Sequence, residues 1–417
     1  MERPVFETKS LERHVQNILN GVKKDGDEAV RHFTKVLDSV ELKDFQVSET
    51  EFDEAEKKVS DELKTAINVA KSNIEKFHRA QIEKPEVIET TPGVFCWRKS
   101  VPIQRVGLYV PAGSAPLFST VLMLGVPAAI AGCKEIVVCS PPARNGKIND
   151  ATLYAAKVCG ITKVFKIGGV QAIGAMAFGT ETVPKVYKIF GPGNQFVTCA
   201  KQLVGQYGTA IDMPAGPSEV AIIADETCVP AFVAADLLSQ AEHGVDSQVL
   251  LVSTSEKVID ETLIELDKQL AKLSRKAIAS KALENSKAIL VENIDEAVEL
   301  LNEYAAEHLI LTCENADEVA EKIVNAGSVF IGNYSCESAG DYASGTNHTL
   351  PTNGFAKAFS GVSLDSFVKK ITFQKLNEEG VGNLGRTIEC MAEAEGLDAH
   401  KNAISIRLEK LAANKHE

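Results

Sequence analysis

Four of the eight histidines in this 417-residue chain stand among acidic, amide and glycine residues. They occur in the stretches Gln240-Ala-Glu-His243, Glu307-His308, Gly340-Asp-Tyr-Ala-Ser-Gly-Thr-Asn-His348 and Glu395-Gly-Leu-Asp-Ala-His400. Imidazole, carboxylate and amide groups together are typical of metal sites and of sites that transfer protons. The other four histidines lie in charged helical or terminal contexts, so we expect them to be solvated: His14, His32, His78 and His416.

Gln240 and His243 are three residues apart near the end of an expected helix over Val229–His243. Residues at this spacing project from one face of a helix, so the pair could supply two ligands to one metal ion. Such a pair also occurs often by chance, and a purely structural role stays open. Asp341 and His400 could complete a nitrogen and oxygen site, although no rule of sequence brings them together.

Glu307 and His308 are adjacent at a point where a helix is expected to end and a strand to begin. At such a junction both side chains can face one cleft and offer a carboxylate and an imidazole for proton transfer. The alternative is a surface glutamate beside a histidine that caps the helix. The pair alone does not decide between them.

The sequence has no complete G-x-G-x-x-G motif for a dinucleotide. The nearest stretch, Gly191-Pro-Gly-Asn-Gln-Phe196, follows an expected strand and precedes an expected helix, but ends in phenylalanine. A helix N-terminus can still hold a pyrophosphate without the motif. The Ala215-Gly-Pro-Ser-Glu219 turn could hold a polar ligand group or serve only as a tight connection.

Short apolar runs alternate with helical segments from about Gln104 onward, which predicts parallel strands joined by right-handed crossovers. The expected strands are Val106–Val110, Glu135–Cys139, Lys163–Ile167, Lys185–Phe190, Glu219–Ala224, Gln248–Val252, Ala288–Val291, His308–Leu311 and Ser328–Ile331. The series predicts two doubly wound modules with a boundary near Asp212–Pro217. The first hundred residues are charged and helical, with a helix start expected at Ser60. The polar residues after Ser366 are expected to form a helical tail.

Composition excludes several classes of partner. The net charge of -13 and the pI of about 5.3 argue against nucleic acid and anionic membranes, which would repel the chain. The most apolar stretch, Leu117 to Cys133, is interrupted by Gly125 and Pro127 and fits a buried helix better than a membrane span. The nine cysteines form no C-x-x-C pair, and the N-terminus lacks a signal peptide, so we expect reduced thiols and a cytoplasmic protein.

Taken together, the segments resemble the histidinol dehydrogenase family from about residue 20 to the end of the chain. The resemblance rests on ordered blocks: Val106-Gly-Leu-Tyr-Val-Pro-Ala-Gly-Ser-Ala-Pro116, Ile189-Phe-Gly-Pro-Gly-Asn194, Met213-Pro-Ala-Gly-Pro-Ser-Glu-Val220, Leu238-Ser-Gln-Ala-Glu-His-Gly244, Tyr304-Ala-Ala-Glu-His-Leu309, Ala339-Gly-Asp-Tyr-Ala-Ser-Gly-Thr-Asn-His-Thr-Leu-Pro351 and Glu395-Gly-Leu-Asp-Ala-His400. So many blocks in order are very unlikely to arise by chance.

The resemblance implies an enzyme of histidine biosynthesis that oxidises L-histidinol to L-histidine through the aldehyde and reduces two NAD. It implies one zinc ion per subunit, held by Gln240, His243, Asp341 and His400. Glu307 and His308 match the catalytic acid/base pair. These residues and the zinc ligands also match substrate-binding positions, together with Ser218, His348 and Glu395. Tyr109, Gln171 and Asn194 match positions that contact NAD.

The resemblance also implies a homodimer in which the C-terminal tail, with Glu395 and His400, serves the partner's site. The expected fold is α/β, with two Rossmann-like modules and a small helical tail from both ends of the chain. We expect residues 101–212 to bind NAD, residues 25–100 with 213–360 to bind zinc and substrate, and residues 1–24 with 361–417 to form the dimerisation tail.

Two other functions stay open. A cysteine-dependent aldehyde dehydrogenase would use a thiolate to form a thiohemiacetal, and Cys199 and Cys336 lie near the relevant blocks. A metal- or amino-acid-binding protein without turnover would need neither member of the Glu307–His308 pair, so the presence of both weighs against it.

Overall fold

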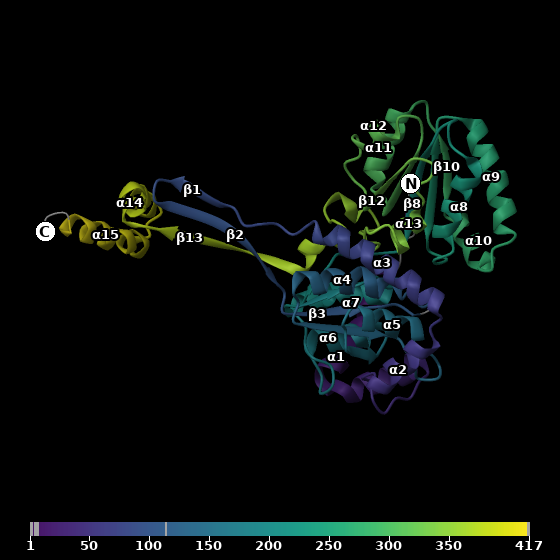
Figure 1. The fold of residues 1–417 in the computed structure, drawn as a ribbon, viewed down its shortest axis with the longest axis horizontal. Coiled ribbons are helices and arrows are strands. Elements are labelled where there is room, and N and C mark those ends of the chain that lie inside the picture. The colour runs from purple at the N-terminus through teal and green to yellow at the C-terminus, as the bar shows by residue number, and fades with distance from the viewer. Residues whose placement is uncertain (1–2, 4–7, 113–114, 415–417) are drawn as a thin grey trace. The chain divides into compact units, whose positions relative to one another are not determined.

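The computed structural model describes residue 3 and residues 8–112 and 115–414. The chain divides into two compact units, one of residues 1–81 and 103–367 and one of residues 82–102 and 368–417 (Figure 1). Within the described ranges, no helix has the length and apolar character needed to span a membrane.

The larger unit contains a first parallel sheet of five strands in the order β5-β4-β3-β6-β7. The strands are β3 (Arg105–Tyr109), β4 (Glu135–Ser140), β5 (Lys163–Lys166), β6 (Lys188–Phe190) and β7 (Ala210–Ile211). Helices α4 (Ser119–Ala131), α5 (Asp150–Val158), α6 (Gly169–Phe178) and α7 (Gln195–Val204) connect them. The chain winds outward from β3 in both directions, which confirms the predicted doubly wound module.

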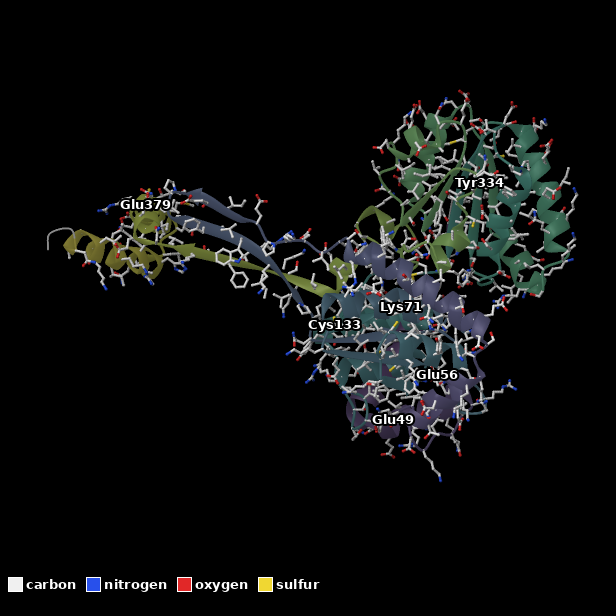
Figure 2. The ribbon with its side chains drawn as sticks, in the orientation of Figure 1. Glu49, Glu56, Lys71, Cys133, Tyr334 and Glu379 are labelled. Atoms are coloured by element: carbon white, nitrogen blue, oxygen red, sulfur yellow. The ribbon has the colours of Figure 1, made fainter. Side chains whose placement is uncertain are left out.

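Three N-terminal helices cover this first sheet: α1 (Thr8–Phe33), α2 (Glu49–Lys58) and α3 (Asp61–Arg79). Helix α1 packs on α6 and α7, α2 on α5, and α3 on α4. The Ser60 hydroxyl accepts a hydrogen bond from the Leu63 N–H, so the predicted start of α3 is confirmed. Polar side chains such as Glu49 remain exposed on α2 (Figure 2).

This packing differs from the domain limits expected from the sequence, which placed residues 1–24 with the C-terminal tail and residues 25–100 with the second module. Residues 8–24 pack on the first sheet, as do residues 49–79, whereas Arg3 forms an ion pair with Glu219 of the second module. The physical reason is that helical periodicity reveals an apolar face without revealing which sheet that face will cover.

The second parallel sheet has the order β10-β9-β8-β11-β12, which is the same winding pattern. Its strands are β8 (Glu219–Ala224), β9 (Gln248–Ser253), β10 (Lys287–Leu290), β11 (His308–Thr312) and β12 (Ser328–Ile331). Its helices are α8 (Pro230–Ala241), α9 (Glu256–Leu270), α10 (Lys276–Glu284), α11 (Ile294–Tyr304), α12 (Ala316–Ala320) and α13 (Glu337–Tyr342).

Strand β8 is buried along its whole length because helices cover both faces of the sheet (Figure 1). Val220 and Ile222 pack with α8, α9 and α10, whereas Ala221 and Ile223 pack with α11 and α12. Alternate side chains of a strand point to opposite faces, so a continuous apolar run is what a doubly covered sheet requires.

The smaller unit holds an antiparallel sheet in the order β1-β2-β13 and two helices. These elements are β1 (Val87–Thr91), β2 (Val94–Pro102), β13 (Val368–Leu376), α14 (Glu378–Ala394) and α15 (Asp398–Ala413). The strands were not predicted, because their residues are largely polar and exposed. The tail after Ser366 is therefore not wholly helical. Among the described residues of the smaller unit, the buried apolar side chains are Val94, Ala392 and Ile404.

Candidate active site

A cleft of about 580 Å³ lies in the larger unit and is lined by loops from both sheets. The first sheet contributes the carboxyl ends of its strands, where Tyr109 ends β3 and Gly191 follows β6. The second sheet contributes the amino ends of its strands, where Ser218 precedes β8 and Glu307 precedes β11. The two sheets thus present opposite edges to one cleft.

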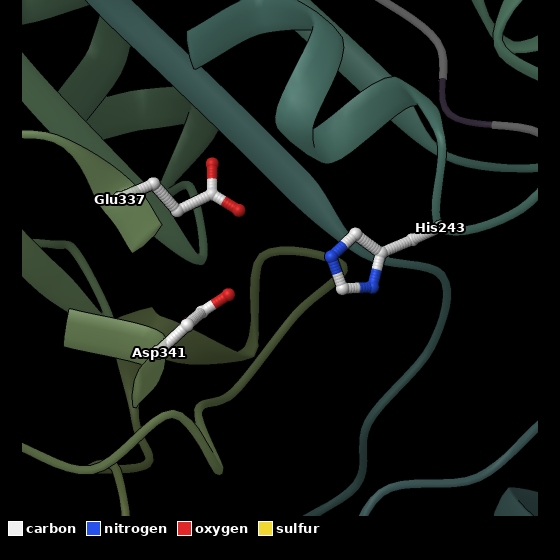
Figure 3. A group of neighbouring side chains, drawn as sticks. All are labelled: His243, Glu337 and Asp341. Carbon is white, nitrogen blue, oxygen red and sulfur yellow. The ribbon is translucent and has the colours of Figure 1, made fainter. Parts of the chain in front are cut away.

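His243, Glu337 and Asp341 form a cluster at the second sheet. One ligand atom from each of the three lies within 4.8 Å of the other two. Their polar atoms point toward one another (Figure 3). Glu337 and Asp341 are four apart on the short helix α13, so both project from one face. Glu337 was missed by the sequence analysis, although this spacing is visible in the sequence.

Gln240 lies beside this cluster, in the last turn of α8. With its amide nitrogen turned toward Glu337, the side chain donates to the Glu337 carboxylate, and its oxygen accepts from the Glu219 N–H at 3.2 Å. The turn after α8, where the His243 N–H donates to the Gln240 carbonyl, brings His243 to the same place. Three members of the predicted ligand set, Gln240, His243 and Asp341, are therefore neighbours.

Glu307 and His308 lie where the sequence analysis placed them, between a helix and a strand. Helix α11 ends at Tyr304, the left-handed backbone of Ala305 (φ 55°) then turns the chain, and β11 begins at His308. Gly327 passes so close that a Cβ atom there would lie 2.5 Å from the Glu307 carbonyl oxygen. The Glu307 side chain lines the cleft, whereas His308 is almost completely buried beside it.

Hydrogen bonds fix the orientation of this pair. The Glu307 carboxylate accepts from the Glu219 N–H at 2.9 Å. The Nδ1 atom of His308 lies 3.2 Å from the Glu219 carbonyl oxygen, and because a carbonyl only accepts, Nδ1 carries a proton. The Nε2 atom of His308 has no hydrogen-bond partner among the described residues and lies 3.5 Å from Asp341 Oδ1. Nε2 is therefore the nitrogen left for proton transfer.

Burial and mutual repulsion disturb the ionisation of this region. Desolvation raises the pKa of Glu307 to about 8, and it raises the pKa of Glu337 well above the ordinary value. Desolvation lowers the pKa of His308, but the carboxylates of Glu337, Glu307 and Asp341 outweigh it and raise the pKa to about 10. The buried carboxylates of the site therefore carry more negative charge than the positive charge of its imidazoles can neutralise.

A divalent cation fits this donor set. Imidazole, carboxylate and amide groups suit zinc and similar ions, and a cation would offset the crowded negative charge that raises the carboxyl pKa values. The residues of this chain that could hold such an ion are therefore Gln240, His243, Glu337 and Asp341.

Two further predicted substrate contacts line the cleft: Ser218 and His348. The imidazole of His348 lies 3.0 Å from the Asp341 carbonyl oxygen and 3.2 Å from the Thr120 hydroxyl, so both ring nitrogens are held. Desolvation lowers the pKa of His348, which favours the neutral ring.

The other end of the cleft is built around backbone groups. The Tyr109 hydroxyl accepts from the Gly169 N–H at 3.1 Å, at the start of α6. Asn194 caps α7, where its side chain accepts from two backbone N–H groups. Gly191 (φ 119°) must be glycine, because a Cβ atom there would meet the Tyr109 carbonyl oxygen at 2.1 Å. Helix N-termini and glycine turns of this kind suit an anionic ligand.

Gln171, the third expected contact with NAD, is fully buried and is not among the residues that line the cleft. Its Nε2 atom donates to Asp38 Oδ2 at 3.0 Å, and it is Asp38 that lines the cleft. No motif pointed to Asp38, because it lies far from the recognised blocks and follows a charged helix.

A buried ion pair supports the glycine turn and was also missed. Lys201 Nζ lies 2.5 Å from Asp212 Oδ1, and both side chains are almost completely buried. Lys201 donates to the Gly191 carbonyl at 2.7 Å, and Asp212 accepts from the Gly191 N–H at 2.8 Å. The pair therefore holds both backbone polar groups of Gly191.

The remaining expected site residues, Glu395 and His400, lie in the smaller unit, on exposed positions of α14's end and of α15. The larger unit alone therefore lacks part of the predicted set. One expectation for the other histidines was wrong: His78 is fully buried, because α3 packs on the first sheet. His416 lies outside the described residues.

Comparisons with known proteins match nearly the whole chain. The family model described as histidinol dehydrogenase matches residues 1–408. A histidinol dehydrogenase of Bacteroides fragilis is 60% identical over 411 residues, which cover 99% of this chain and 96% of the relative. That of Mannheimia succiniciproducens is 54% identical and covers 95% and 92%. The crystal structure of histidinol dehydrogenase from Elizabethkingia anophelis matches with a TM-score of 0.96 and 57% identity, covering 99% and 95%.

Proposed function

Because the chain belongs to the histidinol dehydrogenase family, whose members are oxidoreductases of histidine biosynthesis, we propose that it oxidises L-histidinol to L-histidine through the aldehyde, reducing two NAD. One observation carries the proposal. The buried Glu307–His308 pair adjoins a cluster of metal-binding groups at the end of a cleft whose other end suits a dinucleotide.

Gln240, His243 and Asp341 would hold the zinc ion, with Glu337 close enough to orient Gln240 or to share the ion. The ion would supply a charged anchor for the imidazole and amino nitrogens of histidinol. Ser218 and His348 would contact the substrate from the cleft wall.

With a bound cation offsetting the carboxylates that raise its pKa, His308 would be neutral. It would then accept the hydroxyl proton of the alcohol at Nε2, since Nδ1 is held on the Glu219 carbonyl. Glu307, which faces the cleft and would be ionised beside the same cation, would take a proton from the water that adds to the aldehyde. His308 would then act again for the hydrated intermediate. Groups that transfer protons in this way typically contribute about 10²–10⁴-fold each.

Tyr109, Asn194 and the first turn of α6 would position the dinucleotide, with Gln171 acting behind them. NAD would supply the acceptor for hydride at each oxidation.

A cysteine-dependent route is less favoured, because burial raises the pKa of Cys199 and keeps its thiol protonated. The other candidate nucleophile, Cys336, is exposed and is not among the residues that line the cleft.

A second copy of the chain would complete the site. Few apolar side chains are buried in the smaller unit, whereas Ile371, Phe373, Met391, Leu397 and Ile406 are exposed there. Such a surface is typical of a unit that is covered in an oligomer. A homodimer whose tail places Glu395 and His400 at the partner's site would cover it. We also infer a cytoplasmic location, in which nine free cysteines would stay reduced.

The direct test of the reaction is the yield of NADH per histidinol with zinc present. Two equivalents support the complete oxidation, one indicates arrest at the aldehyde, and none refutes the proposal. Alkylation of cysteines that abolished turnover while the metal stayed bound would instead favour the thiolate route.

Co-expression of His308→Gln and His400→Ala chains tests the shared site. If the tail serves the partner, random pairing restores about a quarter of wild-type activity, because half of the dimers contain one intact site. If the tail serves its own subunit, the mixture stays as inactive as each variant alone.

A further inference from the structure

Asp38 stands at the nucleotide end of the cleft, yet no motif in the sequence accounts for it. It ends the short π-helical turn Thr34–Asp38 that follows α1, and Ser39 then adopts a left-handed backbone (φ 57°). Asp38 lines the cleft together with Tyr109 and Gly169. Burial is the main cause of the raised pKa of Tyr109, and the charge of Asp38 adds to it, as expected for neighbours.

Gln171 holds this carboxylate from behind. Its Nε2 atom donates to Asp38 Oδ2 at 3.0 Å, while its own Oε1 atom is buried and has no hydrogen-bond partner among the described residues. A buried amide that leaves its oxygen unpaired is costly. The hydrogen bond that the Gln171 nitrogen donates to Asp38 therefore explains why a glutamine is buried at this position: it fixes the Asp38 carboxylate.

The other oxygen of Asp38, Oδ1, accepts no hydrogen bond from the described part of the chain. A carboxylate at the wall of a dinucleotide cleft is well suited to accept hydrogen bonds from the ribose hydroxyls of NAD. The same negative charge repels a ribose that carries a 2′-phosphate. Orientation by Gln171 leaves Asp38 available to a ligand in this cleft.

The geometry points to Asp38 as the residue that selects a dinucleotide with a free ribose 2′-hydroxyl over its 2′-phosphorylated form, with Gln171 as its positioning residue. This inference rests on the proposed use of NAD. It adds to Gln171 a positioning role, exerted through Asp38.

The test is equilibrium binding of NAD and of NADP, measured by calorimetry on the full-length enzyme without histidinol. Wild type should prefer NAD. In Asp38→Asn the ratio of NAD affinity to NADP affinity should fall about 10- to 100-fold, the range expected for hydrogen bonds to a charged group. Asp38→Ser should act in the same direction, and Gln171→Leu should give a smaller fall.

Asp44→Asn is the matched control, because Asp44 is an exposed carboxylate six residues further on that does not line the cleft. It should leave the ratio unchanged. A wild-type ratio in both Asp38 variants overturns the inference. If wild type then still forms NADH from histidinol, the proposed function stands without it; if wild type neither binds NAD nor forms NADH, the proposed function fails as well.

Discussion

The two sheets of the larger unit have the same strand order but present opposite edges to the cleft. At the carboxyl edge of the first sheet, helices α6 and α7 begin, with Gly169 and Asn194 at their starts. At the amino edge of the second sheet, helices α8 and α11 end, near Gln240 and Glu307. Helix N-termini favour anions, whereas helix C-termini favour cations. One fold used in two directions can therefore serve a pyrophosphate and a metal ion.

The two edges also differ in the chemical groups that they present to the cleft. The first edge is built largely from backbone groups, a tyrosine hydroxyl and an asparagine cap. The second edge gathers buried carboxylates and imidazoles whose pKa values are displaced. Apart from the selectivity assigned to Asp38, binding of the cofactor should therefore depend mainly on the shape of the backbone, whereas turnover should depend on individual side chains.

The largest effect is expected at the second edge. His308→Gln should lower kcat by about 10²–10⁴-fold, because Nε2 is the available proton acceptor. Bound zinc, measured by elemental analysis, should stay near the wild-type value, because His308 is not in the predicted ligand set. His32→Gln, which changes an exposed ring on α1, is the control. Turnover close to wild type in His308→Gln would contradict the role given to this residue.

An intermediate effect is expected at the first edge. Lys201→Met leaves Asp212 buried without its partner and releases the Gly191 carbonyl. Breaking a buried ion pair in this way typically costs about 3–5 kcal/mol, which a thermal unfolding experiment detects. Where the variant folds, the KM for NAD should rise more than kcat falls, because the turn loosens.

The double variant Lys201→Met with Asp212→Asn should recover part of that stability, since it removes the unpaired charge. Lys185→Met, at an exposed lysine of the same module, should change neither stability nor KM. Equal loss of kcat and unchanged KM in Lys201→Met would show that the pair does not shape the nucleotide end.

The smallest effect concerns His78, a buried histidine of α3 that does not line the cleft. It allows the effect of pH on the stability of the fold to be measured separately from its effect on the site. Desolvation lowers the pKa of His78 below 6.5, so the unfolded chain binds its proton first as pH falls. The free energy of unfolding should therefore decrease below about pH 6.5, by at most about 1.4 kcal/mol per pH unit for one proton.

His78→Leu should reduce that slope in urea unfolding measured between pH 5 and about pH 7.5, near the ordinary histidine range. His32→Leu should not, because its ring is exposed. An unchanged slope in His78→Leu would assign the acid sensitivity to the imidazoles and carboxylates of the cleft.

The parallel sheets were predictable because each strand is a short apolar run, as in Glu219–Ala224. The antiparallel strands of the smaller unit were not, because β13 contains three lysines and its apolar residues Ile371 and Phe373 remain exposed. The blocks identified Gln240, His243 and Asp341. The spacing of Glu337 and Asp341 is visible in the sequence, but only the structure brings Glu337 to His243 and Asp38 to Gln171. Periodicity finds elements, whereas sites depend on how distant elements meet.

The most direct test of the central claim is the zinc content of purified enzyme after chelation and reloading. Wild type should bind one ion per subunit with high affinity, and His243→Gln and Asp341→Asn should each lower that affinity sharply. Glu337→Gln should lower it too, because Glu337 lies within the same cluster. Asp246→Asn, which alters another carboxylate of the cleft outside this cluster, should bind like wild type. Full metal retention by His243→Gln, Asp341→Asn and Glu337→Gln would contradict the account.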